Sequence, residues 1–187
     1  IQNNRRKIVN KLFVFYILIA SLIFAGNKEV FFKAVESKNY KSVESIINKG
    51  FSLEEKNENS ETALSIAVKN NDIKMTKLLI ENGSNVNVLK EDEWALSYLA
   101  EALINNYIDI AKLLIEYGAD VNDEFWIQGP GYQDFFTPLT WACNIDNLEL
   151  CKILIEAGAS LDKEHGGYTP LGRAVINSGK CTKYLIK

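Results

Sequence analysis

A segment of constant length recurs in this chain, and it restricts the fold more than any other feature. Each copy opens on Thr or Ser and closes on Gly 21 residues later, at 62–83, 97–118 and 137–158. The stretch from one closing Gly to the next opening residue varies between 11 and 19 residues. Constant segments that alternate with variable ones are typical of repeat proteins, because the constant part packs against its neighbours while the variable part lies at one edge.

Each constant segment is predicted to hold two helices. Its opening Thr or Ser is suited to cap the first helix, and Pro138 and Pro170 stand at the first helical position, where no amide hydrogen is missed. Leu and Ala three residues apart then bury one face of that helix. A cluster of Leu and Ile marks the second helix, which ends at a glycine that adopts the left-handed conformation without steric cost. The closing glycines are Gly83, Gly118 and Gly158.

Short motifs within these segments point to one family. They are Thr-Pro-Leu-x-x-Ala at 137–142 and 169–174, Leu-Leu-Ile-Glu-x-Gly at 78–83 and 113–118, and the residues after each closing Gly, such as Ala-Asp-Val-Asn at 119–122. With these motifs the chain resembles the ankyrin repeat family over residues 28–187. It departs from that family at the histidine that follows Pro-Leu, which is replaced here by Ser65, Ala100, Thr140 and Gly172.

The resemblance implies an all-α fold, in which helix pairs stack into an ankyrin-type helical solenoid and β-hairpin fingers project from it. Residues 27–187 form the repeat domain in this interpretation. Five repeats are expected, the first degenerate and the last lacking its end, at 28–53, 54–87, 88–122, 123–161 and 162–187. The chain starts with Ile and stops inside a helical pattern, so we expect it to be a fragment. The implied function is binding of another protein on the concave face of fingers and first helices.

The first 26 residues have the pattern of a secretory signal. Four cations at positions 5–11 precede an uncharged, mostly apolar run at 12–26. This run has 15 residues, fewer than the roughly 20 that span the hydrocarbon of a membrane as a helix. We therefore expect cleavage after Ala25 or Gly26 and export to a periplasm or out of the cell. The alternative is an uncleaved membrane anchor.

Charge and composition argue against several classes of function. The formal net charge is −3, and without the four cations before residue 12 the chain has 17 basic residues against 24 acidic ones. An acidic domain lacks the clustered Lys and Arg that nucleic acid requires. His165 is the only histidine, and no His/Cys spacing typical of zinc is present. We expect no enzymatic activity, no cofactor and no metal.

Three cysteines, Cys143, Cys151 and Cys181, lie near the C-terminal end of the sequence. Free cysteine packs well as a small apolar side chain, so we expect buried thiols in the core. The sequence does not place Cys181. The alternative in an exported protein is a disulfide between Cys143 and Cys151, which lie on antiparallel helices of one predicted repeat.

The longest variable stretch, residues 123–136, is rich in aromatic side chains. Five of its 14 residues are Phe, Trp or Tyr, and Gly129-Pro130-Gly131 marks a sharp turn in its middle. The pattern predicts a long hairpin finger. Aromatic residues are enriched in the centres of protein interfaces, so this finger is our main candidate contact surface. The alternative is that the aromatic residues pack internally, which is favoured for Phe135 and Phe136 beside the start of the next helix.

The candidate partner-binding residues are drawn from three predicted fingers. Trp94 lies in the second-longest gap and Tyr168 at the tip of the last finger. The full set is Trp94, Phe125, Trp126, Tyr132, Phe135 and Tyr168. Ile104, Ile145 and Ile176 form a further apolar stripe if they face outward. The sequence thus predicts an exported, monomeric protein-binding module. The alternative is a membrane-anchored structural or protective scaffold without a discrete ligand.

Overall fold

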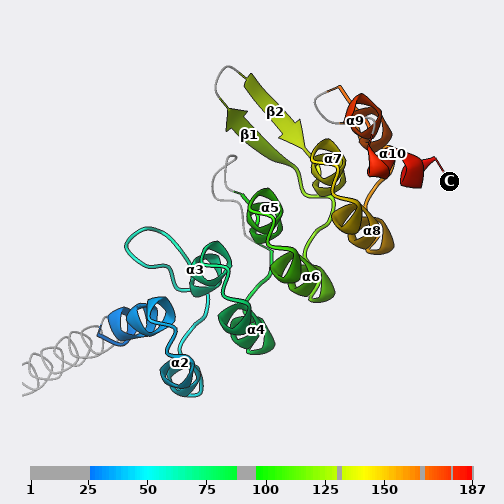
Figure 1. The fold of residues 1–187 in the computed structure, drawn as a ribbon. Helices are drawn as coiled ribbons and strands as arrows, with labels where there is room; N and C mark the ends of the chain where they lie inside the picture. Colours follow the sequence, from blue (N-terminus) through cyan, green and yellow to red (C-terminus); the bar gives the residue numbers. More distant parts are fainter. Residues whose placement is uncertain (1–25, 88–95, 130–131, 165–166, 178, 187) are drawn as a thin grey trace, which may run out of the picture. The chain divides into compact units, whose positions relative to one another are not determined.

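The computed structural model describes residues 26–87, 96–129, 132–164, 167–177 and 179–186 (Figure 1). These residues fall into two compact units, of which the first ends at Ile66 and the second begins at Ala67. Within these ranges, no helix has the length and apolar character needed to cross a membrane. The predicted signal or anchor at 1–26 lies outside them, apart from its last residue.

The first unit contains the predicted degenerate repeat. Residues 26–36 are helical, and helix α2 (Tyr40–Ile47) follows after a short turn. Phe31 is completely buried, and its ring centroid lies 4.4 Å from that of Phe51. The loop after α2 closes with a bridge between Lys56 and Thr62, just before helix α3 (Ala63–Lys69), which contains the boundary between the two units.

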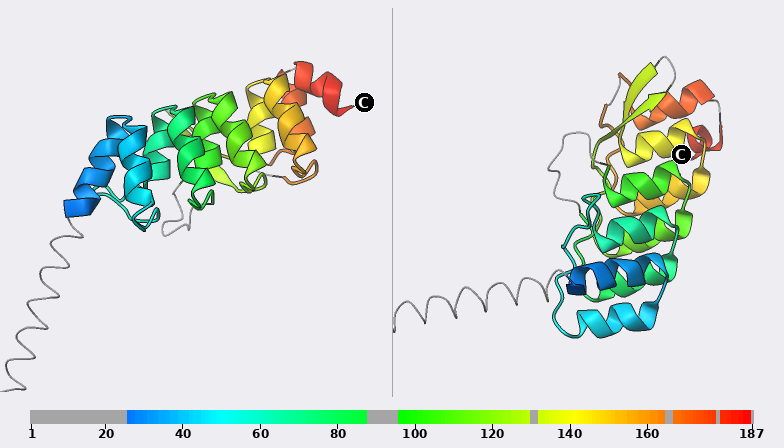
Figure 2. Two further views of the ribbon diagram at one scale, coloured as in Figure 1. Left: turned by 90° about the horizontal axis from the view of Figure 1, so that it is seen from below. Right: turned by 90° about the vertical axis from the view of Figure 1, so that its left-hand side faces the viewer.

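The described residues of the second unit form helix pairs and a hairpin. Its elements in chain order are α4 (Ile73–Glu81), α5 (Tyr98–Ile104), α6 (Ile108–Glu116), strands β1 (Phe125–Gly129) and β2 (Tyr132–Phe136), α7 (Pro138–Asn144), α8 (Leu148–Glu156), α9 (Pro170–Asn177) and α10 (Lys180–Leu185). The first helices of successive pairs pack in a row, α5 against α7 and α7 against α9. The second helices lie in a parallel row, with α4 against α6 and α8 against α10 (Figures 1 and 2).

The predicted caps of the first helices are confirmed. The Ser97 hydroxyl accepts a hydrogen bond of 3.2 Å from the amide of Ala100 at the start of α5. Thr137 and Thr140 form a reciprocal capping box at the start of α7, where Pro138 is the first helical residue. Thr62 and Thr169 accept equivalent bonds from amides three residues later. Because each cap satisfies an amide that the helix itself leaves unpaired, the Thr or Ser fixes where the helix begins.

Asparagine side chains connect neighbouring repeats in the absence of the family's histidine. The Asn87 side-chain amide donates to the Gly118 carbonyl at 3.0 Å, and its oxygen accepts from the Asp120 amide at 2.9 Å. Asn122 repeats the pattern one repeat later, donating to Gly158 and accepting from Ser160. Each asparagine therefore joins its own repeat to the turn that follows the next second helix.

The glycines that close the second helices have the predicted left-handed conformation, with φ between 85° and 97°. At Gly118 a Cβ atom would meet no atom within 4 Å, so only the backbone conformation opposes a larger residue. We expect Gly118→Ala to lower the free energy of unfolding by about 1–2 kcal/mol. Urea denaturation followed by circular dichroism measures this, and an unchanged midpoint would contradict the assigned role of the glycine.

Candidate protein-binding surface

The aromatic finger is a two-stranded antiparallel hairpin, as predicted. Phe125 pairs with Phe136, Trp126 with Phe135, and Gly129 with Tyr132. Because side chains alternate along a strand, paired residues share a face, and the next pair along lies on the opposite face. The hairpin therefore has an inner face that carries Phe125 and Phe136 and an outer face that carries Trp126 and Phe135.

The inner face of the hairpin is part of the core. Phe125 and Phe136 are only 4% and 3% exposed, and they form a buried cluster with Ala100 of α5. The ring of Trp141 on α7 meets Phe136 edge to face, with 5.1 Å between centroids. Trp141 also donates a hydrogen bond of 3.2 Å from Nε1 to the carbonyl of Leu103. The prediction that Phe125 contacts a partner is wrong, because this side chain packs between the hairpin and the first helices.

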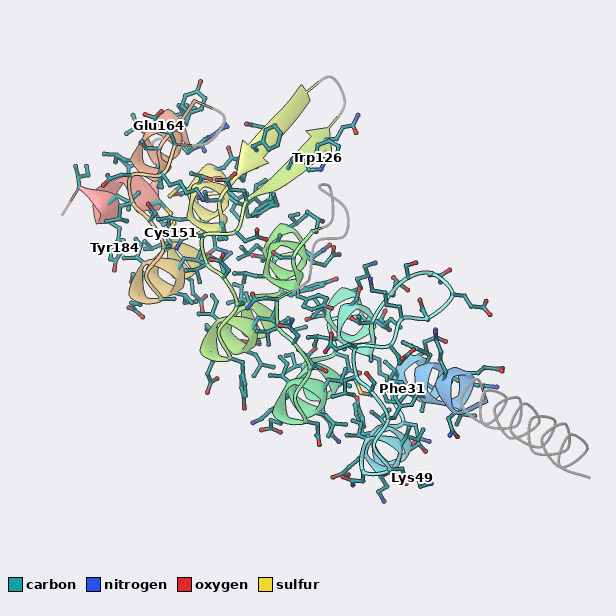
Figure 3. All side chains as sticks on the ribbon, turned by 180° about the vertical axis from the view of Figure 1, so that it is seen from behind. Phe31, Lys49, Trp126, Cys151, Glu164 and Tyr184 are labelled. Carbon is teal, nitrogen blue, oxygen red and sulfur yellow. The ribbon has the colours of Figure 1, made fainter. Side chains whose placement is uncertain are left out.

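The outer face of the hairpin is partly exposed to solvent. Phe135 is 44% exposed, although the adjacent Phe136 is almost completely buried. Trp126, its cross-strand neighbour, is half-buried (Figure 3). Gln128, two residues further along the same face, is exposed. Phe135 is therefore not buried as expected for internal packing, and its role as a contact residue stays a prediction.

Arg173 of α9 fastens the hairpin to the last helix pair. Its guanidinium forms an ion pair with Asp134 of β2. The guanidinium carbon lies 5.0 Å from the ring centroid of Phe136 and 4.4 Å from that of Tyr168, within the range of cation–π attraction. Arg173 and Asp134 have side chains that are 11% and 23% exposed, so the pair is largely shielded from water. Tyr168 itself is 41% exposed and borders the hairpin through Arg173.

Comparison with known families identifies the repeat. A family model described as ankyrin repeats in three copies matches residues 31–125 and again residues 126–187. The chain belongs to the ankyrin repeat family. Ankyrin repeats are in general protein–protein interaction modules. No curated protein matches the chain.

The remaining candidate residues of this ankyrin repeat protein are placed as follows. Trp94 lies outside the described residues, and for Tyr132 the structure describes the backbone pairing but not the side chain. Ile145 and Ile176, at the ends of α7 and α9, are exposed as the stripe requires. Ile104 is partly buried against the core cluster under the hairpin. The predicted stripe therefore does not reach across α5.

The role of Arg173 was not predicted from the sequence, although one feature of the sequence points to it. It is the only arginine after residue 6, in a chain that otherwise uses lysine for its cations. A planar guanidinium stacks on aromatic rings while pairing with a carboxylate, and a lysine ammonium does neither as well. A single arginine five residues after the predicted tip Tyr168 was therefore a sign of a specific packing role.

Proposed function

We propose that this ankyrin repeat protein is an exported module that binds a protein partner through its aromatic platform, defined as Trp126 and Phe135 on the outer face of the hairpin. The observation that carries the proposal is the contrast between neighbours on β2, since Phe136 is 3% exposed and Phe135 is 44% exposed. A large apolar side chain with this much exposed surface on a strand is a candidate contact for a partner. Export is supported by the basic and apolar pattern of residues 1–26.

The hairpin that carries the platform is held by contacts on several sides. Its strand β2 is paired with β1, its inner face packs on α7, and Arg173 holds β2 to α9. Aromatic side chains on a fixed support lose little conformational freedom on binding, which improves affinity for a given contact area. We infer a partner that places apolar or aromatic side chains against the platform. One copy of the repeat protein binds one partner in this proposal, and no enzymatic step is involved.

We expect Trp126→Ala combined with Phe135→Ala to reduce partner capture at least tenfold, the loss typical when central aromatic contacts are truncated. A photoreactive amino acid placed at Gln128, on the same face, reports capture in the exporting cell by crosslinking and mass spectrometry. Both substituted side chains lie on the outer face, so the circular dichroism spectrum should be unchanged.

Tyr117→Ala is the matched control. Tyr117 is 40% exposed, close to the value for Phe135, but it lies at the end of α6 in the row of second helices. Its removal should leave crosslinking from position 128 unaltered. Equal loss of crosslinking in both variants would contradict a binding role for the platform.

Export is tested separately by fractionation and N-terminal sequencing of the mature protein. A soluble species that starts near Asn27 supports it. A membrane-bound species that retains residues 1–26 contradicts cleavage and favours the anchored scaffold.

A further inference from the structure

Three cysteine thiols from three helices meet in the core of the second unit. Cys143 comes from α7, Cys151 from α8 and Cys181 from α10, and all three are completely buried. Their sulfur atoms lie within 4.8 Å of one another, with Cys151 in contact with both of the others (Figure 3). The prediction of buried thiols is confirmed for Cys143 and Cys151, and the structure places Cys181, which the sequence left unplaced, beside them.

The two contacts of Cys151 differ in length. Its sulfur lies 3.7 Å from that of Cys143 but 2.7 Å from that of Cys181. The second separation is much closer to the bonded distance of about 2.0 Å. Cys181 is therefore the better placed partner, although the alternative weighed from the sequence paired Cys151 with Cys143.

The surroundings of the three thiols favour an uncharged disulfide over thiolates that bind a metal. The hydrogen bond with Cys143 and burial both raise the pKa of Cys151, and burial raises the pKa of Cys181 to about 11. A metal would need all three thiols as thiolates in this apolar core. Structural zinc also takes four ligands, whereas the candidate metal group among the described residues holds three cysteines, and the Asp146 carboxylate borders Cys181 alone among the three. A disulfide places no charge in the core and needs only two of the three cysteines.

We propose that Cys151 and Cys181 form a disulfide bond that ties α10 to α8, and that Cys143 remains a free thiol beside it. The bond joins positions 30 residues apart. Helix α10 has only six residues, and its start is held by the Asp146 carboxylate, which accepts from the Cys181 amide at 3.0 Å. A covalent link there stabilises the last helix pair by restricting the unfolded chain. The inference is independent of the proposed partner binding.

The chemistry is thiol–disulfide exchange with a small disulfide such as oxidised glutathione. The Cys151 thiolate attacks one glutathione sulfur, breaks the glutathione disulfide and releases one glutathione thiolate. The Cys181 thiolate then attacks the Cys151 sulfur in the mixed disulfide, forms the Cys151–Cys181 bond and releases the second glutathione. The two cysteines lose two electrons and two protons, and the two glutathiones gain them. Because the thiols are buried in the folded unit, exchange takes place while α10 is still undocked.

The test starts from the reduced, denatured 187-residue chain, refolded in a glutathione redox buffer. Free thiols are alkylated under denaturing conditions, and the protein is digested without reduction. Trypsin combined with a glutamate-specific protease cuts after Glu149, Lys152 and Lys180, which places the three cysteines on separate peptides. The expected result is a Cys151 peptide linked to a Cys181 peptide, with Cys143 alkylated.

Two variants sharpen the test. Cys143→Ala should keep the link, and oxidation should raise its thermal midpoint by at least about 5 °C, as in the unaltered chain. Cys151→Ala should form no intramolecular link, and the redox buffer should not alter its thermal midpoint. The proposal is overturned by a helical, folded protein with three alkylated thiols, or by a link that joins Cys143 to Cys151. It is also overturned if native mass spectrometry after zinc exposure and dialysis shows one retained zinc ion per chain.

Discussion

Phe136→Ala is expected to lower the free energy of unfolding by about 3–5 kcal/mol, the range for phenylalanine removed from a packed core. The ring of Phe136 is 3% exposed and contacts three groups at once, namely Phe125, Trp141 and the guanidinium of Arg173. Its loss leaves a cavity between the hairpin and α7 that these neighbours cannot fill without moving the strand. Urea denaturation monitored by Trp fluorescence and by circular dichroism measures the change.

The adjacent phenylalanine provides the control. Phe135→Ala removes the same number of atoms one residue away, from a side chain that is 44% exposed. Its free energy of unfolding should stay within about 0.5 kcal/mol of the unaltered chain. Similar losses of unfolding free energy for both variants would show that the outer face of the hairpin is packed in solution. That result would contradict the proposed binding platform.

Arg173→Met is expected to cost about 2–3 kcal/mol of unfolding free energy, less than for a fully buried ion pair because Asp134 is 23% exposed. Methionine keeps the length of the side chain but leaves the Asp134 carboxylate without its cation. One oxygen of the Asp134 carboxylate still accepts a hydrogen bond from the amide of Phe135. The other oxygen loses its partner in a site that is largely shielded from water. Hydrogen exchange should therefore rise at the amides of β2 before it rises at those of α7.

A double substitution separates the charge from the packing. Arg173→Met combined with Asp134→Leu removes both charges and should recover most of the stability, since an apolar pair often replaces a shielded ion pair without loss. Arg173→Met alone with unchanged stability and unchanged exchange in β2 would contradict the fastening role. If the double variant is as unstable as Arg173→Met, stacking on Phe136 and Tyr168 outweighs the ion pair.

The fold was predictable because its main determinants are local. A capping residue, a glycine 21 positions later and apolar residues between them define each helix pair without reference to the rest of the chain. Thr137 and Gly118 act as expected for this reason. The hairpin was predictable for the same reason, since Gly129-Pro130-Gly131 lies between two aromatic strands.

The division of the hairpin into two faces was not predictable. Phe125 and Phe136 face the core while Trp126 and Phe135 face solvent, so both faces carry aromatic residues. A strict alternation of apolar and polar residues along β1 and β2 would have shown which face of the hairpin is buried, and these strands lack such an alternation. The same limit applies to Arg173 and Cys181, whose partners lie 39 and 30 residues away and are brought close only by stacking of the repeats.

The alternation along β1 and β2 has a consequence for how this protein can evolve. In the proposed binding mode, every second residue of β1 and β2 packs against the repeats, and the residues between them contact the partner. The two sets of residues are then under separate constraints. Trp126, Gln128 and Phe135 can be exchanged for other side chains while Phe125, Phe136 and Asp134 stay fixed. A lineage under pressure to change partners could thus vary its specificity at a few positions without first accumulating compensating changes in the repeat stack.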